Sequence, residues 1–438
     1  MRIRHLWIPA GLLALLWPAA PLLAQTQTPT PGVGAPVRAA PAAAPLGAVL
    51  NLEQVLQAAR LNPDAQAAQR AAQAARAEVR MADRAPAPVL SAGVASIDVA
   101  GSSGGFWHQR RLDKSIGVDW TWERGHKRAL RTEAAERTAR AATADGQDAQ
   151  VLQQIGALGA FYDLLTAQER LQTLQELAAS ARALAAGAER RLQAGDLSAQ
   201  DSARTRIEAA RAEADLQSAL LLHQQAMQAL AVWIGQNVPA GGWRAEGAWP
   251  QAAAPATPAD IDALVERRPD VLAARERLAA LDAALQGALA LQRADPTLGT
   301  TFDHFPTGEK TDRLLAVRVS IPIHGASRFE GDIRRALAEK DQAQDRLDKA
   351  RILARAELLG LLQAWQSQSE RLRGYEAQIL PQARQVAALA ELAYSKGGLS
   401  LTDLLDARRT LRATQLEAAV VRGEHARAQG AWRLRTAP

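Results

Sequence analysis

The sequence contains no cysteine and few long apolar runs, and each of these two features excludes a class of protein. Aromatic residues are few as well, at 4%. The absence of cysteine among the 438 residues excludes a disulfide framework, a thiolate metal site and a lipid-modified N-terminal cysteine. Beyond the N-terminus, no apolar run reaches the roughly 20 residues that a membrane-spanning helix needs. Residence in a membrane after export would therefore require β-strands.

Patterns typical of catalysis and of ligand binding are scarce as well. The seven histidines are scattered without an i, i+4 pair, and the three methionines offer few ligands for a soft metal. His304 and His324 could face each other in one expected strand pair, but we do not predict a metal site there. Acidic and basic residues are interspersed, and no basic stripe is interleaved with aromatic residues. We therefore predict no enzyme activity, no cofactor, no metal site and no nucleic-acid partner.

The N-terminus has the features of an export signal. A basic head with Arg2 and Arg4 precedes a short apolar core and small residues. This pattern predicts a secretory signal peptide over residues 1–24, cleaved after Ala24, with an uncleaved anchor as the alternative. Residues 25–49 are rich in proline, alanine, threonine and glycine, which predicts a flexible arm.

Two halves with the same order of features follow the arm. We predict a first repeat over residues 50–236, a linker over 237–257 and a second repeat over 258–438. Each repeat is expected to contain a helix of about thirty residues, a strand pair and a long helical hairpin. The first helices run to about Arg84 and Ala294. The strand pairs lie near 89–123 and 297–323, with loops at 101–113 and 306–312.

The helical hairpins are long and are broken by similar turns. Residues 127–194 would span roughly 100 Å at about 1.5 Å per residue, so they must pack along partners as a coiled coil. Four residues are expected to break or bend the long helical stretches: Gly146, Gly156, Gly159 and Pro381. The hairpin tips lie at 194–198 and 396–400, where a glycine that can end a helix precedes Ser198 or Ser400. Each serine is followed three residues later by an acid, Asp201 or Asp403, as at a capped helix start.

The strand pairs carry the decisive pattern for a membrane location. Ile116, Val118 and Trp120 alternate with polar residues, and the same alternation runs from Leu315 to Ile323. Such segments match strands with one face toward lipid and the other toward a water-filled lumen. Four strands cannot close a barrel, so several copies would have to share one, and three copies give a feasible even count of twelve. Two soluble β-hairpins that cap a coiled coil are the alternative.

This duplicated order of helix, strand pair and helical hairpin resembles the TolC-like outer membrane factor family. The supporting residues are the Leu50-Asn51-Leu52-Glu53 start, the glycine exits from the strand pairs and the Gly-x-Leu-Ser tips. The resemblance implies a mainly α fold with membrane β-strands. A homotrimer would form a 12-stranded β-barrel and a helical tunnel in the outer membrane of a Gram-negative bacterium. It also implies contact with outer-membrane lipid and with a periplasmic adaptor (membrane fusion protein) and an inner-membrane pump.

Within that family, one segment resembles the heavy-metal cation efflux branch. The run Glu123-Arg124-Gly125-His126-Lys127-Arg128 is similar to the Glu-x-Gly-Gly-Lys-Arg exit of that branch, although His126 replaces one of its glycines. The resemblance therefore implies an exit duct in a tripartite efflux system, and its branch points to metal cations. The alternative is a periplasmic coiled-coil adaptor or a structural protein of an export system.

The functional residues are expected at the hairpin tips. The residues predicted to contact the adaptor are Gly195, Leu197, Ser198, Gly397, Leu399 and Ser400, for which a simple turn is the alternative role. The residues that could form a charged constriction, or gate, are Asp196, Asp201, Asp403 and Asp406. For Asp201 and Asp403, helix capping is the competing role. Arg204, Arg408 and Arg409 are expected to pair with these acids across the hairpins and to hold the tunnel end closed.

Overall fold

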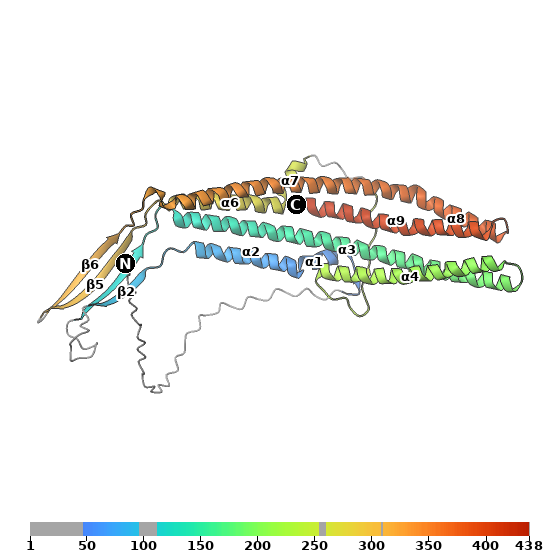
Figure 1. The fold of residues 1–438 in the computed structure, drawn as a ribbon, viewed down its shortest axis with the longest axis horizontal. Helices are drawn as coiled ribbons and strands as arrows, with labels where there is room; N and C mark the ends of the chain where they lie inside the picture. The colour runs from blue at the N-terminus through green and yellow to red at the C-terminus, as the bar shows by residue number, and fades with distance from the viewer. Residues whose placement is uncertain (1–46, 96–111, 254–259, 308–309, 438) are drawn as a thin grey trace, which may run out of the picture. The chain divides into compact units, whose positions relative to one another are not determined.

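The computed structural model describes residues 47–95, 112–253, 260–307 and 310–437. These described residues belong to one compact unit. The predicted signal peptide and most of the predicted arm lie outside the described residues. Within this unit, Figure 1 shows the long strands at one end of the helices and the two hairpin turns at the opposite end.

Each half of this unit contains short entry helices followed by a long helical hairpin. The helices of the first half are α1 (Leu52–Arg60), α2 (Pro63–Ala82), α3 (Lys127–Gln193) and α4 (Ala199–Ile234). Those of the second half are α5 (Ile261–Arg267), α6 (Pro269–Ala290), α7 (Glu330–Gly374), α8 (Leu380–Ser395) and α9 (Leu401–Thr436). Helix α3 packs against α2, α4, α6 and α9, and α7 packs against α6 and α9. The two halves are thus held together along α3 and α9.

The single entry helix expected in each half is wrong, because a proline divides it in both. Asn62 caps α2 by accepting a hydrogen bond from the backbone N–H of Asp64, and Pro63 occupies the first turn. The Asn62 amide also donates to the carbonyl oxygens of Val232 and Trp233, both at 2.9 Å. In the second half, Arg268 is extended before Pro269, as residues before proline tend to be. The second helices end at Ala82 and Ala290, somewhat before the predicted ends.

The glycines of the first long helix do not break it, so a break at these positions is wrong. Helix α3 is continuous over 67 residues. Gly156 instead allows close packing, since an added Cβ would lie 2.3 Å from a ring carbon of Trp233. In the second half, a π-helical turn, η3 (Tyr375–Ile379), interrupts the long helix directly before α8, which carries Pro381 in its first turn. The irregularity expected near Pro381 is therefore present.

Four antiparallel strands form one sheet in the order β2-β3-β5-β6. They are β2 (Val89–Ala95), β3 (Asp113–Thr121), β5 (Thr297–Thr307) and β6 (Lys310–Ser320). The loop expected over residues 306–312 is wrong, because β5 and β6 continue to Thr307 and from Lys310 as a tight hairpin. Most of the loop predicted at 101–113 lies outside the described residues. The two strand pairs therefore join side by side through β3 and β5.

The segment predicted as a linker, 237–257, packs closely on the helices in its described part. Strand β4 (Arg244–Ala245) pairs in parallel with β1 (Val49–Leu50), which lies at the end of the predicted arm. The Gln168 side chain of α3 accepts a hydrogen bond from the Ala245 N–H at 2.7 Å and donates to its carbonyl at 3.1 Å. Trp243 is buried in a core cluster with Phe161. These contacts fasten the crossing between the halves to the middle of α3.

No helix in the described part of the chain is both long enough and apolar enough to cross a membrane.

Candidate channel-forming sheet and hairpin tips

One face of the four-stranded sheet is apolar and exposed. The register places Trp120 beside Leu298 and Leu298 beside Val319, so all three side chains lie on the same face. Their exposed fractions are 62%, 48% and 62%. The same face continues away from the helices through Ile116, Val118, Phe302, Leu315 and Val317, all of them exposed. An exposed apolar surface of this extent marks a lipid or protein contact.

The opposite face of the sheet is polar and carries a bridge across three strands. Asp119 on β3 and Arg318 on β6 flank Gly299 on β5, and their side chains join at 2.9 Å. A Cβ at Gly299 would lie 2.3 Å from the Asp119 carboxylate oxygen, so glycine leaves the room that this pair occupies. One register position further, the Thr301 hydroxyl donates to Asp303 at 3.1 Å. The predicted division into an apolar and a polar face therefore holds at these positions of β3, β5 and β6, whereas Val89 on β2 and Leu314 on β6 place apolar side chains on the polar face.

Both edges of this sheet lack a neighbouring strand within the described residues. Strand β2 pairs with β3 alone, and β6 pairs with β5 alone. An unpaired edge presents backbone N–H and C=O groups that water or another strand must satisfy. In lipid only another strand can do so.

A polar joint fixes the start of α3 to the second half of the chain. The Lys127 ammonium donates to Asp295 at 2.7 Å and to the Arg293 carbonyl at 2.6 Å, and the Arg124 N–H donates to Asp295 at 2.8 Å. Gly125 and His126 both adopt the left-handed conformation there, with φ of 76° and 59°. Glycine tolerates this conformation best, which explains physically why a Gly-Gly pair suits the turn and why His126 is strained in it.

The predicted helix reversals are present at both hairpin tips. Gly195 and Gly397 have φ of 81° and 74°, a conformation that an L-residue rarely adopts. Ser198 and Ser400 cap α4 and α9 by accepting hydrogen bonds from the N–H groups of Asp201 and Asp403 at 3.0 and 3.2 Å.

The tip acids differ in their surroundings. Asp201 and Asp403 accept hydrogen bonds from the capping serine hydroxyls at 2.8 and 2.7 Å, which is the capping arrangement. Asp196 is exposed in the turn itself. Asp406 lies one turn into α9, where it accepts a hydrogen bond from Arg409 at 3.3 Å.

The tip leucines are half-buried rather than fully presented to solvent. Leu399 packs against a small core cluster that contains Leu401, Leu404 and Leu405. Gly195 and Gly397, in contrast, are exposed, and an added Cβ would meet no atom within 4 Å. The glycines thus leave the backbone exposed at the end of each hairpin. In the second hairpin, Leu399 packs on the core directly behind the exposed turn.

Ion pairs and hydrogen bonds join the two hairpins behind the tips. Arg409 of α9 donates from Nη2 and Nε to one carboxylate oxygen of Glu208 on α4, at 2.8 and 3.2 Å. The hydrogen bond to Glu208 raises the pKa of Arg409 further above its ordinary value. Arg204 of α4 donates to Thr402 at 2.8 Å, and Arg412 pairs with Asp215. We call this set of contacts the inter-hairpin latch.

The latch corrects the pairing expected for the arginines. Arg409 does pair with Asp406, but its partner across the hairpins is Glu208, which the sequence did not single out. Arg408 pairs with Glu391 on the neighbouring helix of its own hairpin and donates to Ser180 at 3.4 Å. Arg204 lies 3.7 Å from Asp201 on its own helix. No tip aspartate among these pairs bridges the hairpins.

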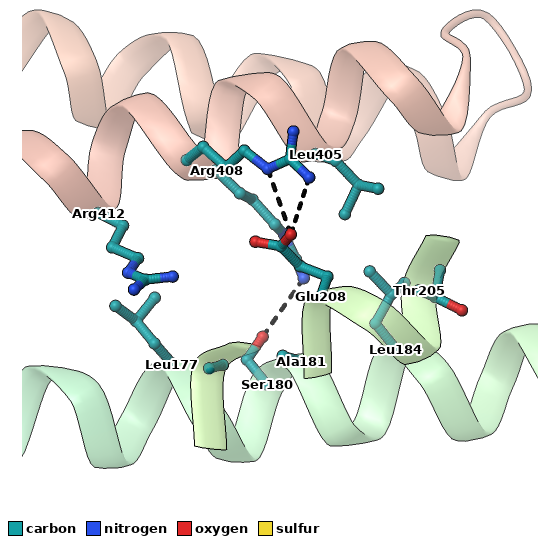
Figure 2. Close-up of a pocket in the computed structure, with 11 residues that line it drawn as sticks. Leu177, Ser180, Ala181, Leu184, Thr205, Glu208, Leu405, Arg408 and Arg412 are labelled. Atoms are coloured by element: carbon teal, nitrogen blue, oxygen red, sulfur yellow. Dashed lines mark hydrogen bonds and ion pairs between the residues drawn. The ribbon is translucent and has the colours of Figure 1, made fainter. Parts of the chain in front are cut away.

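The space enclosed by the latch is too small for a solute. The cavity that Leu177, Glu208 and Arg412 help to line has a volume of about 50 Å³, which is room for one or two waters (Figure 2). Within the described ranges, no cluster of three or more metal-ligating side chains occurs. His304 lies opposite Lys114 far from the helices, whereas His324 contacts Phe329 next to them. The two histidines therefore do not face each other.

A model of one protein family matches most of the chain. The outer membrane efflux protein model matches residues 55–236 and 261–435. Each matched segment contains one strand pair and one hairpin tip. The chain belongs to the outer membrane efflux protein family.

Individual proteins that are similar to this chain agree with this assignment. The cobalt-zinc-cadmium resistance protein CzcC of Cupriavidus metallidurans is 30% identical over 293 residues, which cover 66% of this chain and 68% of CzcC. The solved structure of CusC has a TM-score of 0.74 at 18% identity and covers 88% of this chain and 91% of CusC. VceC of Vibrio cholerae has a TM-score of 0.70 at 18% identity and covers 88% of this chain and 95% of VceC.

The family assignment decides between the functions that the sequence left open. This outer membrane efflux protein is a channel component of a tripartite efflux system, with a helical periplasmic extension, and not an enzyme. It resides in the outer membrane of a Gram-negative bacterium. A periplasmic adaptor with one hairpin is the wrong assignment, since the chain has two hairpins and one shared sheet.

Proposed function

We propose that this efflux protein is a homotrimeric exit duct for heavy-metal cations, docked end to end on a periplasmic adaptor through its two hairpin tips. The observation that carries the proposal is the four-stranded sheet, which has one exposed apolar face, one polar face and two edges that pair with no strand of the described residues. The 30% identity to a cobalt-zinc-cadmium resistance protein supports the class of cargo.

The edges of the sheet support a closed oligomer, and twelve strands from three copies are a feasible even count. In each protomer, β2 and β6 expose a row of backbone groups that lipid cannot satisfy. Pairing β6 of one copy with β2 of the next would satisfy both edges at once. Three copies would then form a closed 12-stranded barrel, with the apolar face toward outer-membrane lipid and the Asp119–Arg318 face toward the lumen.

Metal cations as cargo are supported by the relative and by the resemblance of the strand exit to that of the heavy-metal cation efflux branch. The segment from Glu123 to Arg128 places Lys127 and Asp295 in a shared joint between strand and helix. This joint depends on the left-handed turn at Gly125 and His126. A duct of this kind requires weak contacts with its cargo, because tight binding would prevent release.

Adaptor docking is proposed at six tip residues: Gly195, Leu197, Ser198, Gly397, Leu399 and Ser400. The exposed backbone at Gly195 and Gly397 presents carbonyl groups to an incoming helical tip, since the N–H groups of these glycines already donate to the carbonyls of Leu192 and Tyr394. The capping serines and the packed Leu399 keep those turns rigid. A rigid turn loses little conformational entropy on binding.

Gating is proposed at four acids near the tips, Asp196, Asp201, Asp403 and Asp406, with the inter-hairpin latch holding the closed state. Asp196 is the strongest candidate for a charged constriction, because Asp201 and Asp403 already accept hydrogen bonds from serines and Asp406 pairs with Arg409. Opening the end would require the Arg409–Glu208 pair to separate.

The cargo is tested by deleting the gene and measuring tolerance to cobalt, zinc and cadmium salts beside dyes and antibiotics. We expect metal tolerance to fall and to return with the wild-type gene. Reduced tolerance to organic compounds with unchanged metal tolerance would overturn the metal assignment.

Docking is tested separately by Leu197→Arg, which places a charge in the turn at a residue proposed to contact the adaptor. The matched control is Leu337→Arg, at a 47% exposed position of α7 away from the tips. We expect the first variant to lose efflux while remaining in the outer membrane as trimers, and the control to retain efflux. Equal efflux in the two variants would place the adaptor contact elsewhere.

A further inference from the structure

A groove lies where the apolar face of the sheet meets the helices. Its volume is about 770 Å³, and its lining includes Trp120, Trp122, Leu298, Val319, Pro296 and Arg128. The two tryptophans are 62% and 74% exposed, so their rings present apolar surface to the surroundings. Arg128, at the start of α3, is the basic residue in this lining.

We propose that this groove binds one diacyl phospholipid of the membrane leaflet that faces the periplasm, with the phosphate at Arg128 and an acyl chain along the apolar face. The inference rests on the proposed placement of that face against lipid. Tryptophan commonly lies at the boundary between hydrocarbon and headgroups, because its ring is largely apolar and carries one polar N–H group. The groove lies where that boundary would fall if the helices extend into the periplasm.

The charge at Arg128 is suited to a phosphate. Its Nε donates to Asp83 at 2.9 Å, and in the described part of the chain neither Nη nitrogen has a hydrogen-bond partner. A guanidinium can donate two parallel hydrogen bonds to a phosphate, so one edge of Arg128 remains available. The acid in the lining, Glu123, does not oppose an anion strongly, because Arg131 donates to both of its oxygens at 3.0 and 3.3 Å.

The apolar face is long enough for one acyl chain. From Trp122 to Ile116 the exposed residues of β3 extend about 20 Å at about 3.3 Å per residue. One leaflet supplies roughly half of a hydrocarbon core that is about 30 Å thick. The acyl chain of the lipid can therefore lie along Val118, Phe302 and Val317, on the same face of the sheet as the groove.

The proposal is tested by native mass spectrometry of the detergent-purified protein with phosphatidylglycerol or with diacylglycerol of the same chains. We expect the phospholipid to remain bound and the diacylglycerol, which lacks the phosphate, to be retained at least tenfold less. Equal retention of the two lipids would overturn the assignment of the phosphate to Arg128. We also expect that free inorganic phosphate does not displace the phospholipid. Complete displacement of the phospholipid by inorganic phosphate would identify a simple anion site and overturn the lipid assignment.

Charge variants locate the headgroup. Arg128→Gln should weaken phosphatidylglycerol binding about tenfold, since it removes charge-assisted hydrogen bonds. The matched control is Arg124→Gln, which removes the same charge from an exposed side chain outside the groove lining. Equal losses in the two variants would show general attraction between charges and overturn the site.

Two further variants act in opposite directions. Asp83→Asn removes the carboxylate that competes for Arg128, so binding should strengthen severalfold, and weaker binding would contradict the role of Arg128. Leu298→Ser shortens the apolar wall at a half-exposed position and should weaken both lipids. Unchanged binding in Leu298→Ser would place the acyl chain away from this face. The metal-tolerance assay is independent of these results, so failure of either proposal can be recognised separately.

Discussion

Replacing Glu208 by glutamine should open the closed end of the tunnel. Glu208 accepts two hydrogen bonds from Arg409 across the hairpins, and its side chain is 14% exposed while that of Arg409 is 48% exposed. Loss of a partly exposed ion pair costs about 0.5–1 kcal/mol. Three protomers would lose about 1.5–3 kcal/mol together, so the ratio of open to closed channels should rise between about tenfold and a hundredfold.

The assay is single-channel recording in planar bilayers, with open probability as the measured quantity. The matched control is Glu213→Gln on the same helix. Glu213 lies 4.0 Å from Arg182, and both belong to the first hairpin, so this pair does not cross to the second hairpin. Glu208→Gln should open the channel and Glu213→Gln should leave it unchanged. An open probability for Glu208→Gln no higher than that of the control would refute the latch as a gate.

Two other predictions concern packing and pH. Gly156→Ala should destabilise the protein by about 1–2 kcal/mol through overlap with Trp233, whereas Gly187→Ala on the same helix, with no atom within 4 Å of an added Cβ, should stabilise it by about 1 kcal/mol. Thermal unfolding measures both, and equal shifts would contradict the contact with Trp233. Burial lowers the pKa of His425 below 6.5, despite the opposing effect of Glu376. The unfolded chain therefore takes up this proton first as the pH falls below about 6.5, and the free energy of unfolding should decrease there. His425→Leu should flatten that decrease in denaturation measured at pH 5.5 and 7.5, and an unchanged slope would assign it to other groups.

The features that could be predicted from the sequence are those set by neighbours along the chain. The alternation around Val118 and the Ser198 and Ser400 caps depend on a few consecutive residues, so their patterns are readable without the fold. The duplication placed both strand pairs and both tips correctly for the same reason. The sequence shows that four strands cannot close a barrel and that more strands are needed. It does not show that the two strand pairs join through β3 and β5, as they do in the structure.

The features that could not be predicted depend on residues far apart in the chain. Glu208 resembles many other acids on the helices, and its role exists only because α9 brings Arg409 beside it. A glycine inside a helix, such as Gly156, predicts a break when only its neighbours in the sequence are considered. The contact that explains this glycine is with Trp233, 77 positions away, and it leaves no local signal. The division of the first entry helix has a local signal, since Asn62 before Pro63 is a common helix start, but the prediction of one continuous helix does not use it.

The central claim is that one face of the sheet lies in lipid and the other faces a water-filled lumen. Because the chain contains no cysteine, a single spin label can be introduced at each position of β6 without removing any native residue. Power saturation in lipid bilayers should then show oxygen access at Val317 and Val319 and access to a water-soluble nickel complex at Arg318. Nickel access at all three positions, or no alternation along the strand, would contradict the membrane placement and the channel model built on it.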